Sequence, residues 1–406
     1  MTTETTSTPI TRAKPNLFRD FSLSAFVAAF VAVLVSYSGP FAVVTQAAQA
    51  GGLSAAETTS WVWAISIGSG ITCLVLSLWT RMPVITAWST PGAALLIASL
   101  GGHSFPAAVG AYLFAAIAMT IIGYTGALGW VMARIPKGIV SALLAGILLQ
   151  FVLAAFQAVP SAPVLTISVI AAFVLARRFL PRYAVLVALA VGAAIAGFSG
   201  QLGGLAQVSP EIALPTFTMP ELSFPAIISI GIPLLLVTLT SQNAPGLEVL
   251  RTSGYAPDDR KLVGFTGLVS VLLAPLGSHA VNLAAITAAI CTGPEAHENP
   301  RRRYVAGVVT GVFYLVIGLF SVGLVQVFVA LPSELVAVVA GVALLGAVLG
   351  GLVGAVEDVT SRDAALITLA VTASGLTVAG IGSAFWGLVA GLLVHAILSF
   401  KRRATT

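Results

Sequence analysis

Long uninterrupted apolar segments constrain this chain more than any other feature. Runs such as residues 107–132, 305–330 and 335–356 contain no charged residue. At about 1.5 Å per helical residue, each is long enough to cross about 30 Å of hydrocarbon. Of the 406 residues, 58% are hydrophobic and 8% are charged, whereas an ordinary soluble domain has roughly 25% charged residues. Because no soluble core could enclose so much apolar surface, the sequence predicts an all-α polytopic membrane protein.

Polar residues and Pro/Gly breaks divide the apolar sequence into fourteen expected membrane spans. They are residues 22–48, 60–79, 84–100, 106–133, 138–158, 163–179, 183–198, 226–250, 261–275, 277–291, 303–330, 333–355, 363–378 and 380–400. The expected organisation is a cytoplasmic tail, a first seven-span repeat, an external linker and a second seven-span repeat, at residues 1–20, 21–198, 199–225 and 226–400.

The distribution of basic residues predicts how these spans are oriented. With the N-terminus inside, all nineteen Lys and Arg residues fall on the cytoplasmic side. The outside loops then carry only Glu57, Glu211, Glu221 and Glu334 among the charged residues. This asymmetry follows the positive-inside rule. Both termini are therefore expected in the cytoplasm, and the net charge of +5 reflects topology rather than a nucleic-acid partner.

The two cysteines, Cys73 and Cys291, lie in or beside apolar segments. This placement argues against a disulfide framework or a metal cluster, and we expect both to be small buried residues. No cofactor or metal is expected.

Two pairs of segments predict an inverted internal repeat. Residues 35–40 of the first span resemble residues 239–245 of the eighth, and each contains a proline that is expected to break its span. The third and tenth spans are both short, and each is polar at its centre, at residues 86–92 and 277–282. Because each half has an odd number of spans, the second half must cross the membrane in the opposite sense. Short interrupted segments at matching positions of inverted halves are the usual sequence indication of a transporter's central site.

The third and tenth spans could hold an anion without a buried basic side chain. The free N–H groups and partial positive charge of a helix N-terminus attract anions. Thr90, or Ser89 beside it, can be the N-cap of a half-helix in which Pro91 takes the first position and Gly92 leaves the backbone open to a ligand. Asn282 is expected to cap a second half-helix after an extended stretch. The alternative is that these polar residues only connect neighbouring helices.

His279 is the one titratable residue placed near the bilayer centre, and Ser278 beside it is expected in the same site. A histidine can exchange a proton near neutral pH, so His279 is the candidate for proton coupling. It could instead be a neutral hydrogen-bonding partner. Gln242 and Asn243 offer amides either to a carboxylate or to unwound backbone, and Tyr37, like Trp88, could form an aromatic wall of the site or simply pack.

These features resemble one known family. With fourteen spans in two inverted sevens, Ser-Gln-Asn-Ala-Pro-Gly at 241–246 and Gly-Ser-His-Ala-Val-Asn at 277–282, the chain resembles the bacterial benzoate/proton symporters over about residues 18–400. That family is distantly similar to the nucleobase/ascorbate transporters, which carry glutamates where this chain has Gln242 and His279. A site without those carboxylates suits an anionic substrate better.

The resemblance implies a function and a domain arrangement. The expected function is proton-coupled import of benzoate, or a similar small aromatic carboxylate, across the bacterial inner membrane. The expected architecture has a core domain of spans 1–4 and 8–11, a gate domain of spans 5–7 and 12–14, and short extended stretches in spans 3 and 10. The sequence leaves open whether the protein is a monomer or a homodimer in the lipid membrane.

Two alternatives remain open from the sequence. One is a nucleobase or inorganic-anion carrier of the same fold. The other is a membrane-embedded enzyme acting on lipid-linked substrates, for which the acidic pairs Asp258–Asp259 and Glu357–Asp358 could hold Mg²⁺. Basic residues flank both pairs, and we expect Glu248 to form an ion pair with Arg251 one turn along its helix. No enzymatic activity is therefore predicted.

Overall fold

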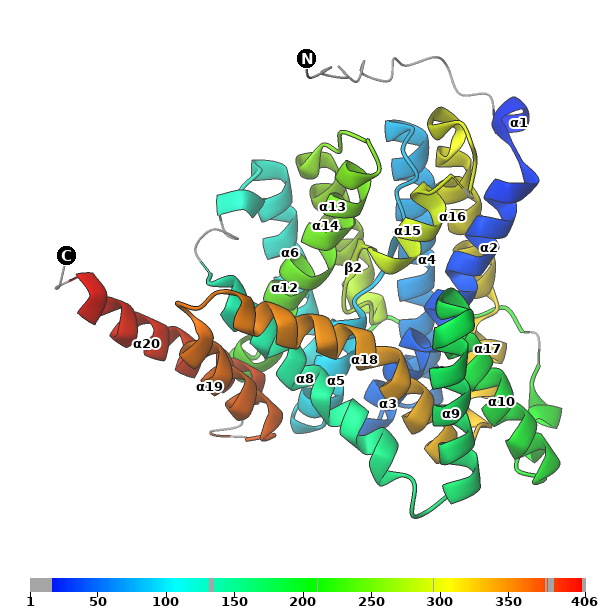
Figure 1. The fold of residues 1–406 in the computed structure, drawn as a ribbon. Helices are drawn as coiled ribbons and strands as arrows, with labels where there is room; N and C mark the ends of the chain where they lie inside the picture. The colour runs from blue at the N-terminus through cyan, green and yellow to red at the C-terminus, as the bar shows by residue number, and fades with distance from the viewer. Residues whose placement is uncertain are drawn as a thin grey trace.

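The computed structural model describes residues 17–130, 135–209, 211–294, 296–376, 378 and 383–403 (Figure 1). Most of the predicted N-terminal tail lies outside these residues, and its end forms the short helix α1 (Leu17–Asp20). The helices of the first half are α2 (Leu23–Ser38), α3 (Pro40–Ala50), α4 (Ala55–Thr80), α5 (Thr90–Ser99), α6 (Phe105–Thr125), α8 (Lys137–Gln157), α9 (Pro163–Phe179) and α10 (Ala184–Phe198). Those of the second half are α11 (Phe224–Ala226), α12 (Ile232–Thr238), α13 (Ala244–Thr252), α14 (Asp259–Leu273), α15 (Ile286–Thr292), α16 (Tyr304–Leu319), α17 (Ser321–Val329), α18 (Ser333–Glu357), α19 (Arg362–Ala373) and α20 (Ser383–Arg403).

Seven helical runs in the described chain are long and apolar enough to cross a membrane. They are Leu23–Ala50, Ala55–Thr80, Phe105–Thr125, Lys137–Gln157, Phe224–Thr252, Pro300–Leu319 and Ser333–Glu357. Three shorter apolar helices accompany them, at Thr90–Gly102, Ala184–Phe198 and Ser383–Ser399. The chain is thus a polytopic helical membrane protein, as predicted, while the count of fourteen spans stays a prediction.

Local signals explain several helix ends. A capping box of Ser54 and Glu57 begins α4, and the Ser104 hydroxyl accepts a hydrogen bond at the start of α6. Gly126 ends α6 in the left-handed conformation, with φ of 75°, inside the expected span 106–133. Residues 131–133 of that span lie outside the described residues. The expected span 303–330 divides into α16 and α17 at Phe320.

The two prolines that were expected to break spans behave differently. In the first span the helix does break, since α2 ends at Ser38 and α3 begins at Pro40. In the eighth span the prediction was wrong, because the chain remains helical from Phe224 to Thr252. Two π-helical turns, η4 (Ile227–Gly231) and η5 (Leu239–Asn243), widen that helix instead. A wider turn accommodates the missing N–H of a proline without ending the helix.

The helices pack in two groups. The first, here called the ladder bundle, pairs α4 with α16 and α6 with α14, and includes α2, α3, α5, α12, α13, α15 and α17. The second, here called the flanking bundle, pairs α8 with α18 and α19 with α20, and includes α9 and α10. In Figure 1, α8 and α18 lie side by side.

The bundles approach each other closely at Gly39, in the break between α2 and α3. A Cβ atom at Gly39 would lie 2.5 Å from the Cβ of Ala343 on α18 and 2.9 Å from Cγ1 of Val185 on α10. Only glycine permits this contact.

Two short strands lie at the centre of the ladder bundle. Strand β1 (Thr86–Trp88) pairs antiparallel with β2 (Val281–Leu283), and Ala87 is opposite Asn282. Each strand is held by the long helix that precedes it. The backbone N–H of Thr86 donates to Sγ of Cys73 at 3.1 Å, and that of Val281 donates to Oγ of Ser270 at 2.9 Å. Such partners satisfy buried backbone that forms no helix.

Candidate functional site

The strand pair brings the two polar segments of the sequence together and positions the start of α5. Ser89 is the N-cap of α5, because its Oγ accepts a hydrogen bond from the N–H of Gly92 at 3.1 Å. Its own N–H lies 3.4 Å from the carbonyl oxygen of Ala280, which continues the ladder by one residue. Of the two caps considered from the sequence, Ser89 is therefore the one used, and Pro91 follows Thr90 inside the helix.

Thr90 and Gly92 have different surroundings at this helix start. No hydrogen bond engages the half-buried Thr90 hydroxyl among the described residues. A Cβ atom at Gly92 would lie 2.5 Å from Cδ1 of Leu234 and 2.9 Å from Oγ of Ser89. The glycine thus permits close packing of Leu234 from α12, and its part in ligand binding stays a prediction. Thr90 is the group available to a ligand here.

The expected cap of the second half-helix is not formed. Asn282 lies inside β2, and α15 begins later, at Ile286, after Ala285, which offers no capping side chain. The Asn282 Nδ2 atom donates to the carbonyl oxygen of Leu283 at 3.0 Å, and its buried Oδ1 has no partner in the described chain. Strand pairing displaced the helix start, and α15 has only seven residues.

His279 links three segments and is 1% exposed. The indole N–H of Trp61 on α4 donates to its Nδ1 at 2.9 Å, and its Nε2 lies 2.9 Å from the carbonyl oxygen of Ser89. Because a carbonyl only accepts, Nε2 must carry the hydrogen and Nδ1 must be unprotonated. The geometry therefore shows a neutral imidazole that supports the start of α5.

The two amide side chains of the eighth span, Asn243 and Gln242, have different roles in the structure. Oδ1 of Asn243 accepts the N–H of Leu283 in β2 at 3.0 Å, and its Nδ2 lies 3.4 Å from Sδ of Met119. Asn243 is fully buried, so in this structure it satisfies strand backbone, one of the two roles considered. Gln242 is half-buried, and within the described residues its amide makes no hydrogen bond.

Thr238 was missed by the sequence analysis. Its hydroxyl donates to Oγ of Ser89 at 3.3 Å and thereby joins α12 to the start of α5. Neither Thr238 nor Trp61 belongs to a motif, and nothing in an apolar sequence marks such distant partners.

Aromatic side chains cluster beside β1. The ring of Tyr37 lies 5.0 Å from that of Trp88 and 5.9 Å from that of Tyr314, measured between centroids. The Tyr37 hydroxyl donates to Oγ of Ser66 at 2.6 Å. The Nε1 atom of Trp88 and the Oγ atom of Ser278 are buried without partners in the described chain. Both are polar groups that a ligand or water could serve.

A small cavity of about 10 Å³, lined by residues of α6, α12 and α14, touches His279. A cavity of this size is just large enough to hold one water molecule.

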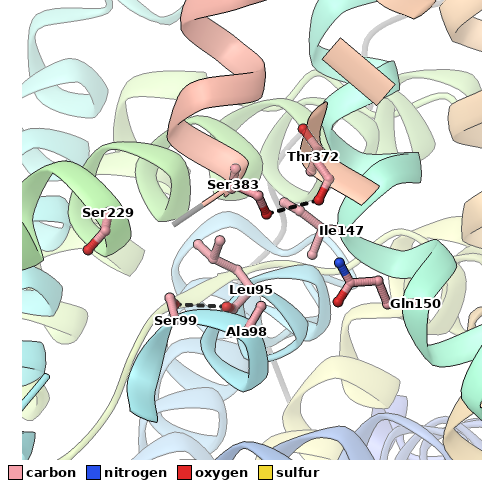
Figure 2. A pocket seen from close by; sticks show the side chains of 9 residues that line it. Leu95, Ala98, Ser99, Ile147, Gln150, Ser229, Thr372 and Ser383 are labelled. Carbon is pink, nitrogen blue, oxygen red and sulfur yellow. Dashed lines mark hydrogen bonds between the residues drawn. The ribbon is translucent and has the colours of Figure 1, made fainter. Parts of the chain in front are cut away.

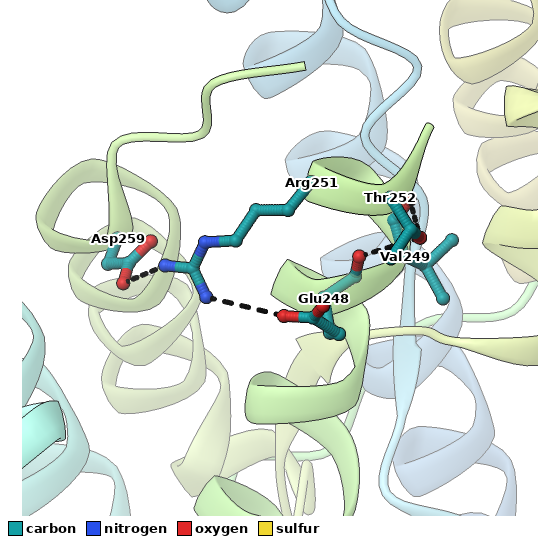
Figure 3. Close-up of polar contacts among 5 residues, drawn as sticks. All are labelled: Glu248, Val249, Arg251, Thr252 and Asp259. Carbon is teal, nitrogen blue, oxygen red and sulfur yellow. Dashed lines mark hydrogen bonds and ion pairs between the residues drawn. The ribbon is translucent and has the colours of Figure 1, made fainter. Parts of the chain in front are cut away.

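Three carboxylates of the acidic pairs that suggested a metal site contact neighbouring side chains, as Figure 3 shows for Asp259. They are Asp258, Asp259 and Asp358. Arg251 contacts Glu248 at 4.0 Å, the expected pair, and lies closer to Asp259, at 2.5 Å. Lys261 contacts Asp258 at 3.0 Å, and this hydrogen bond lowers the pKa of the Asp258 carboxyl. Asp358 accepts hydrogen bonds from Thr360 and Ser361. No group of three or more candidate metal ligands occurs among the described residues.

Solved structures with a similar fold include an SLC26A9 structure described as an anion transporter and a bicarbonate transporter domain. The overall structure of SLC26A9 matches with a TM-score of 0.61 at 14% identity, covering 98% of this chain and 73% of that one. The transmembrane domain of the cyanobacterial bicarbonate transporter BicA matches with a TM-score of 0.55 at 16% identity, covering 92% and 98%. At this identity the likeness shows the fold alone.

Sequence relatives are closer. The benzoate membrane transport protein of Acinetobacter baylyi is 41% identical over 382 residues, which cover 94% of this chain and 97% of the relative. The inner membrane protein YdcO of Escherichia coli is 40% identical over 373 residues, covering 92% and 95%. These matches confirm a transporter rather than an enzyme. The model of the benzoate membrane transport protein family matches residues 19–397, and the chain belongs to that family.

Proposed function

We propose that this protein is a proton-coupled secondary transporter that imports benzoate, or a similar small aromatic carboxylate, across the bacterial cytoplasmic membrane. The observation that carries the proposal is the family match over residues 19–397. A relative at 41% identity bears the name benzoate membrane transport protein, and another is an inner membrane protein.

The carboxylate binds at the N-terminus of α5. This helix has ten residues, and its first turn presents its positive end and the free hydroxyl of Thr90. The buried basic side chain Arg303 does not compete for this role, because it donates to the carbonyl oxygens of Thr292 and His297. The backbone dipoles at the start of α5 and the neutral Thr90 hydroxyl thus bind the carboxylate in place of a basic side chain. The seven-residue helix α15 contributes less.

The amide of Gln242 and the aromatic cluster of Tyr37 and Trp88 complete the proposed site. Thr238 contacts Ser89 at the start of α5, and Gln242 lies four residues further along the same helical run. The free amide of Gln242 is therefore on an element that is joined to the start of α5. Tyr37 and Trp88 provide flat apolar surface on the β1 side, which suits an aromatic ring.

Proton coupling through His279 remains part of the proposal, with one structural condition. The ring is hydrogen-bonded at both nitrogens, so a proton can bind at Nδ1 only after the Trp61 indole withdraws. Proton binding would therefore accompany a rearrangement between α4 and the strand pair. Ser278 and Asn282, with buried unpaired polar atoms beside this histidine, would take up new partners in that step.

The packing of the helices supports the proposed architecture of two inverted repeats. The ladder bundle contains the segments expected for the core domain, and the flanking bundle contains those expected for the gate. The antiparallel pairing of β1 with β2 agrees with halves of opposite sense. We place both termini in the cytoplasm from the distribution of basic residues.

Ligand-dependent thermal stabilisation tests the substrate class, because a ligand that binds the folded state raises its melting temperature. The purified protein should be stabilised by benzoate, and less by benzamide, which has the same ring without the charge. Uracil should have no effect. Stabilisation by uracil or bicarbonate, with none by benzoate, would identify a nucleobase or inorganic-anion carrier instead.

A further inference from the structure

An extended segment of residues 211–221, here called the outer strap, crosses one end of the ladder bundle. It forms neither helix nor strand. Its backbone N–H groups donate to carbonyl oxygens at the start of α6, in the turn η6 (Ala274–Leu276) after α14, and at the end of α16. These bonds join Glu221 to Pro106 at 3.0 Å, Thr218 to Pro275 at 2.7 Å and Ala213 to Leu319 at 2.8 Å. The outer strap thus holds the ends of three neighbouring segments together.

Ser60 of α4 connects the outer strap to η6. Its Oγ accepts the backbone N–H of Thr216 at 2.8 Å. Its own hydrogen is directed to two carbonyl oxygens, that of Thr216 at 3.0 Å and that of Leu276 at 2.9 Å. Ser60 is 2% exposed. One buried hydroxyl therefore contacts both the strap and the turn that follows α14.

The bonds of Ser60 differ from those of other helical serines. A serine inside a helix often bonds the carbonyl oxygen one turn earlier in the same helix. Ser69 of α4 donates in this way to Ile65 at 2.7 Å, and Ser99 of α5 donates to Leu95 at 2.8 Å, as Figure 2 shows for Ser99. The hydroxyl of Ser60 bonds to other segments instead, so it holds those segments against α4.

Ser60 begins a row of three contacts that leads to the candidate proton site. The first is its bond to Leu276. In the second, a Cβ atom at Gly277, whose φ is 96°, would lie 3.1 Å from Cα of Trp61, so the two backbones pack directly on each other. The third is the bond of 2.9 Å from the Trp61 indole to Nδ1 of His279. The strap-bound hydroxyl is at one end of this row, and the histidine is at the other.

We propose that Ser60 is a positioning residue for the proton step, through which the outer strap keeps the Trp61 indole on His279. Without the Ser60 hydroxyl, the segment that carries His279 is held less firmly against α4. The indole then withdraws from Nδ1 more readily, and the histidine takes up a proton at a higher pH. This inference rests on the proposed proton coupling through His279.

Other titratable groups near this row are not bonded to the Ser60 hydroxyl. Tyr112 of α6 packs against His279, with ring centroids 6.4 Å apart. The side chains from α6, α12 and α14 that line the small cavity at His279 include none that titrates. Three carboxylates near the outer strap each accept a hydrogen bond from a serine other than Ser60, and they are Glu57, Glu211 and Glu221. A change in pH dependence on loss of the Ser60 hydroxyl therefore reports on the Trp61–His279 contact.

The pH dependence of benzoate uptake in proteoliposomes tests the proposal. We expect Ser60→Ala to raise the pH of half-maximal uptake by about 0.3–0.5 unit, because a weakened hydrogen bond shifts the opening of the contact about two- to threefold. In the Trp61→Phe background the same substitution should add no shift, since the contact is already absent. Ser69→Ala is the matched control on the same helix, and it should leave the profile unchanged.

A second variant tests the outer strap itself. Thr216→Pro removes the N–H that donates to Ser60 and leaves the bond from Ser60 to Leu276 in place. Pro215 before it and the extended backbone are compatible with a proline at this position. We expect the pH of half-maximal uptake to rise in this variant also. A profile identical to that of wild type would remove the strap from the proton step.

Amide hydrogen exchange measures the same contact without transport. The N–H groups of Gly277 and Ser278 donate to the carbonyl oxygens of Ala274 and Leu273, so their exchange reports how firmly this turn is held. In the purified full-length protein, we expect exchange here to be about two- to threefold faster in Ser60→Ala than in wild type. Ser69→Ala should exchange at the wild-type rate.

The two measurements separate this inference from the proposed function. Protein-dependent benzoate uptake whose pH profile ignores Ser60→Ala, shifts equally in Ser69→Ala, or shifts further in the Trp61→Phe background overturns the role of Ser60 and keeps the substrate. If benzoate uptake is absent, the substrate is refuted and amide exchange decides on Ser60. Faster exchange in Ser60→Ala alone then supports its positioning of the histidine segment, and unchanged exchange overturns it.

Discussion

Nδ1 of His279 accepts a hydrogen bond of 2.9 Å from the indole Nε1 of Trp61. The opposite ring nitrogen lies 2.9 Å from the carbonyl oxygen of Ser89, at the N-cap of α5. One partner can only donate and the other can only accept, so this arrangement fixes the neutral ring. The tryptophan is therefore the group that must move before His279 can take up a proton.

Replacing the indole tests that relationship. Trp61→Phe keeps an aromatic side chain but frees Nδ1 for a proton. We expect the pH of half-maximal benzoate uptake to rise by about 0.5–1 unit, the equivalent of one hydrogen bond. The measurement is the initial rate of uptake against pH in proteoliposomes. The double variant Trp61→Phe/His279→Gln is the control, and an identical shift in it would assign the effect to another group.

The N-terminus of α5 provides a pair of variants with different outcomes. Thr90→Val removes a hydroxyl that no described residue engages, so folding should be unaffected while KM for benzoate rises about tenfold, as for a lost hydrogen bond to a charged group. Ser89→Ala removes the cap and should lower the free energy of unfolding by about 1 kcal/mol. Uptake kinetics and thermal unfolding are measured on both. An unchanged KM for Thr90→Val would remove the carboxylate from this helix start.

The contact at Gly39 predicts a compensating pair. Gly39→Ala places a Cβ atom 2.5 Å from the Cβ of Ala343, so the two bundles must separate locally and uptake should fall severely. Ala343→Gly removes the nearest obstacle and should restore part of the activity in the double variant. Uptake and melting temperature are compared for the three variants. If the double variant is no better than Gly39→Ala, the glycine is required for the break in the helix rather than for the contact.

His103 predicts a pH-dependent stability. Burial lowers the pKa of its imidazole below the ordinary value of about 6.5. The neutral imidazole is therefore favoured in the folded protein. Its contribution to the stability of the folded protein is fully present above about pH 6.5 and is lost as the pH falls through the lowered pKa. Nε2 of His103 lies 2.7 Å from Oγ of Ser229. We expect the melting temperature of wild type to fall more steeply below pH 6.5 than that of His103→Gln, whose amide can still donate to Ser229. Parallel curves would show that His103 does not titrate in this range.

The sequence predicted the elements whose signals are local. Gly39–Pro40 breaks the first span because proline favours a helix start and glycine tolerates the close contact. The polar segments around Ser89 and His279 meet, as their matching positions in the two halves suggested.

Features that depend on distant partners were not predictable. Pro245 lies in a continuous helix directly after a π-helical turn, and nothing in the local sequence indicated that turn. Asn282 lies in a strand because Ala87 pairs with it, and no property of the tenth span alone indicates this register. The packing of Leu234 against Gly92 could not be predicted either, because Leu234 comes from a span far away in sequence.

The most direct test of the account is the initial rate of labelled benzoate uptake into proteoliposomes under an imposed pH gradient. Protein-free liposomes must be subtracted, because the neutral acid crosses bare bilayers. The account predicts protein-dependent uptake that is faster when the interior is alkaline and that loses this acceleration when a protonophore is added. Protein-dependent uptake at the same rate with and without the gradient would contradict proton coupling, and the absence of protein-dependent benzoate uptake would contradict the proposed substrate.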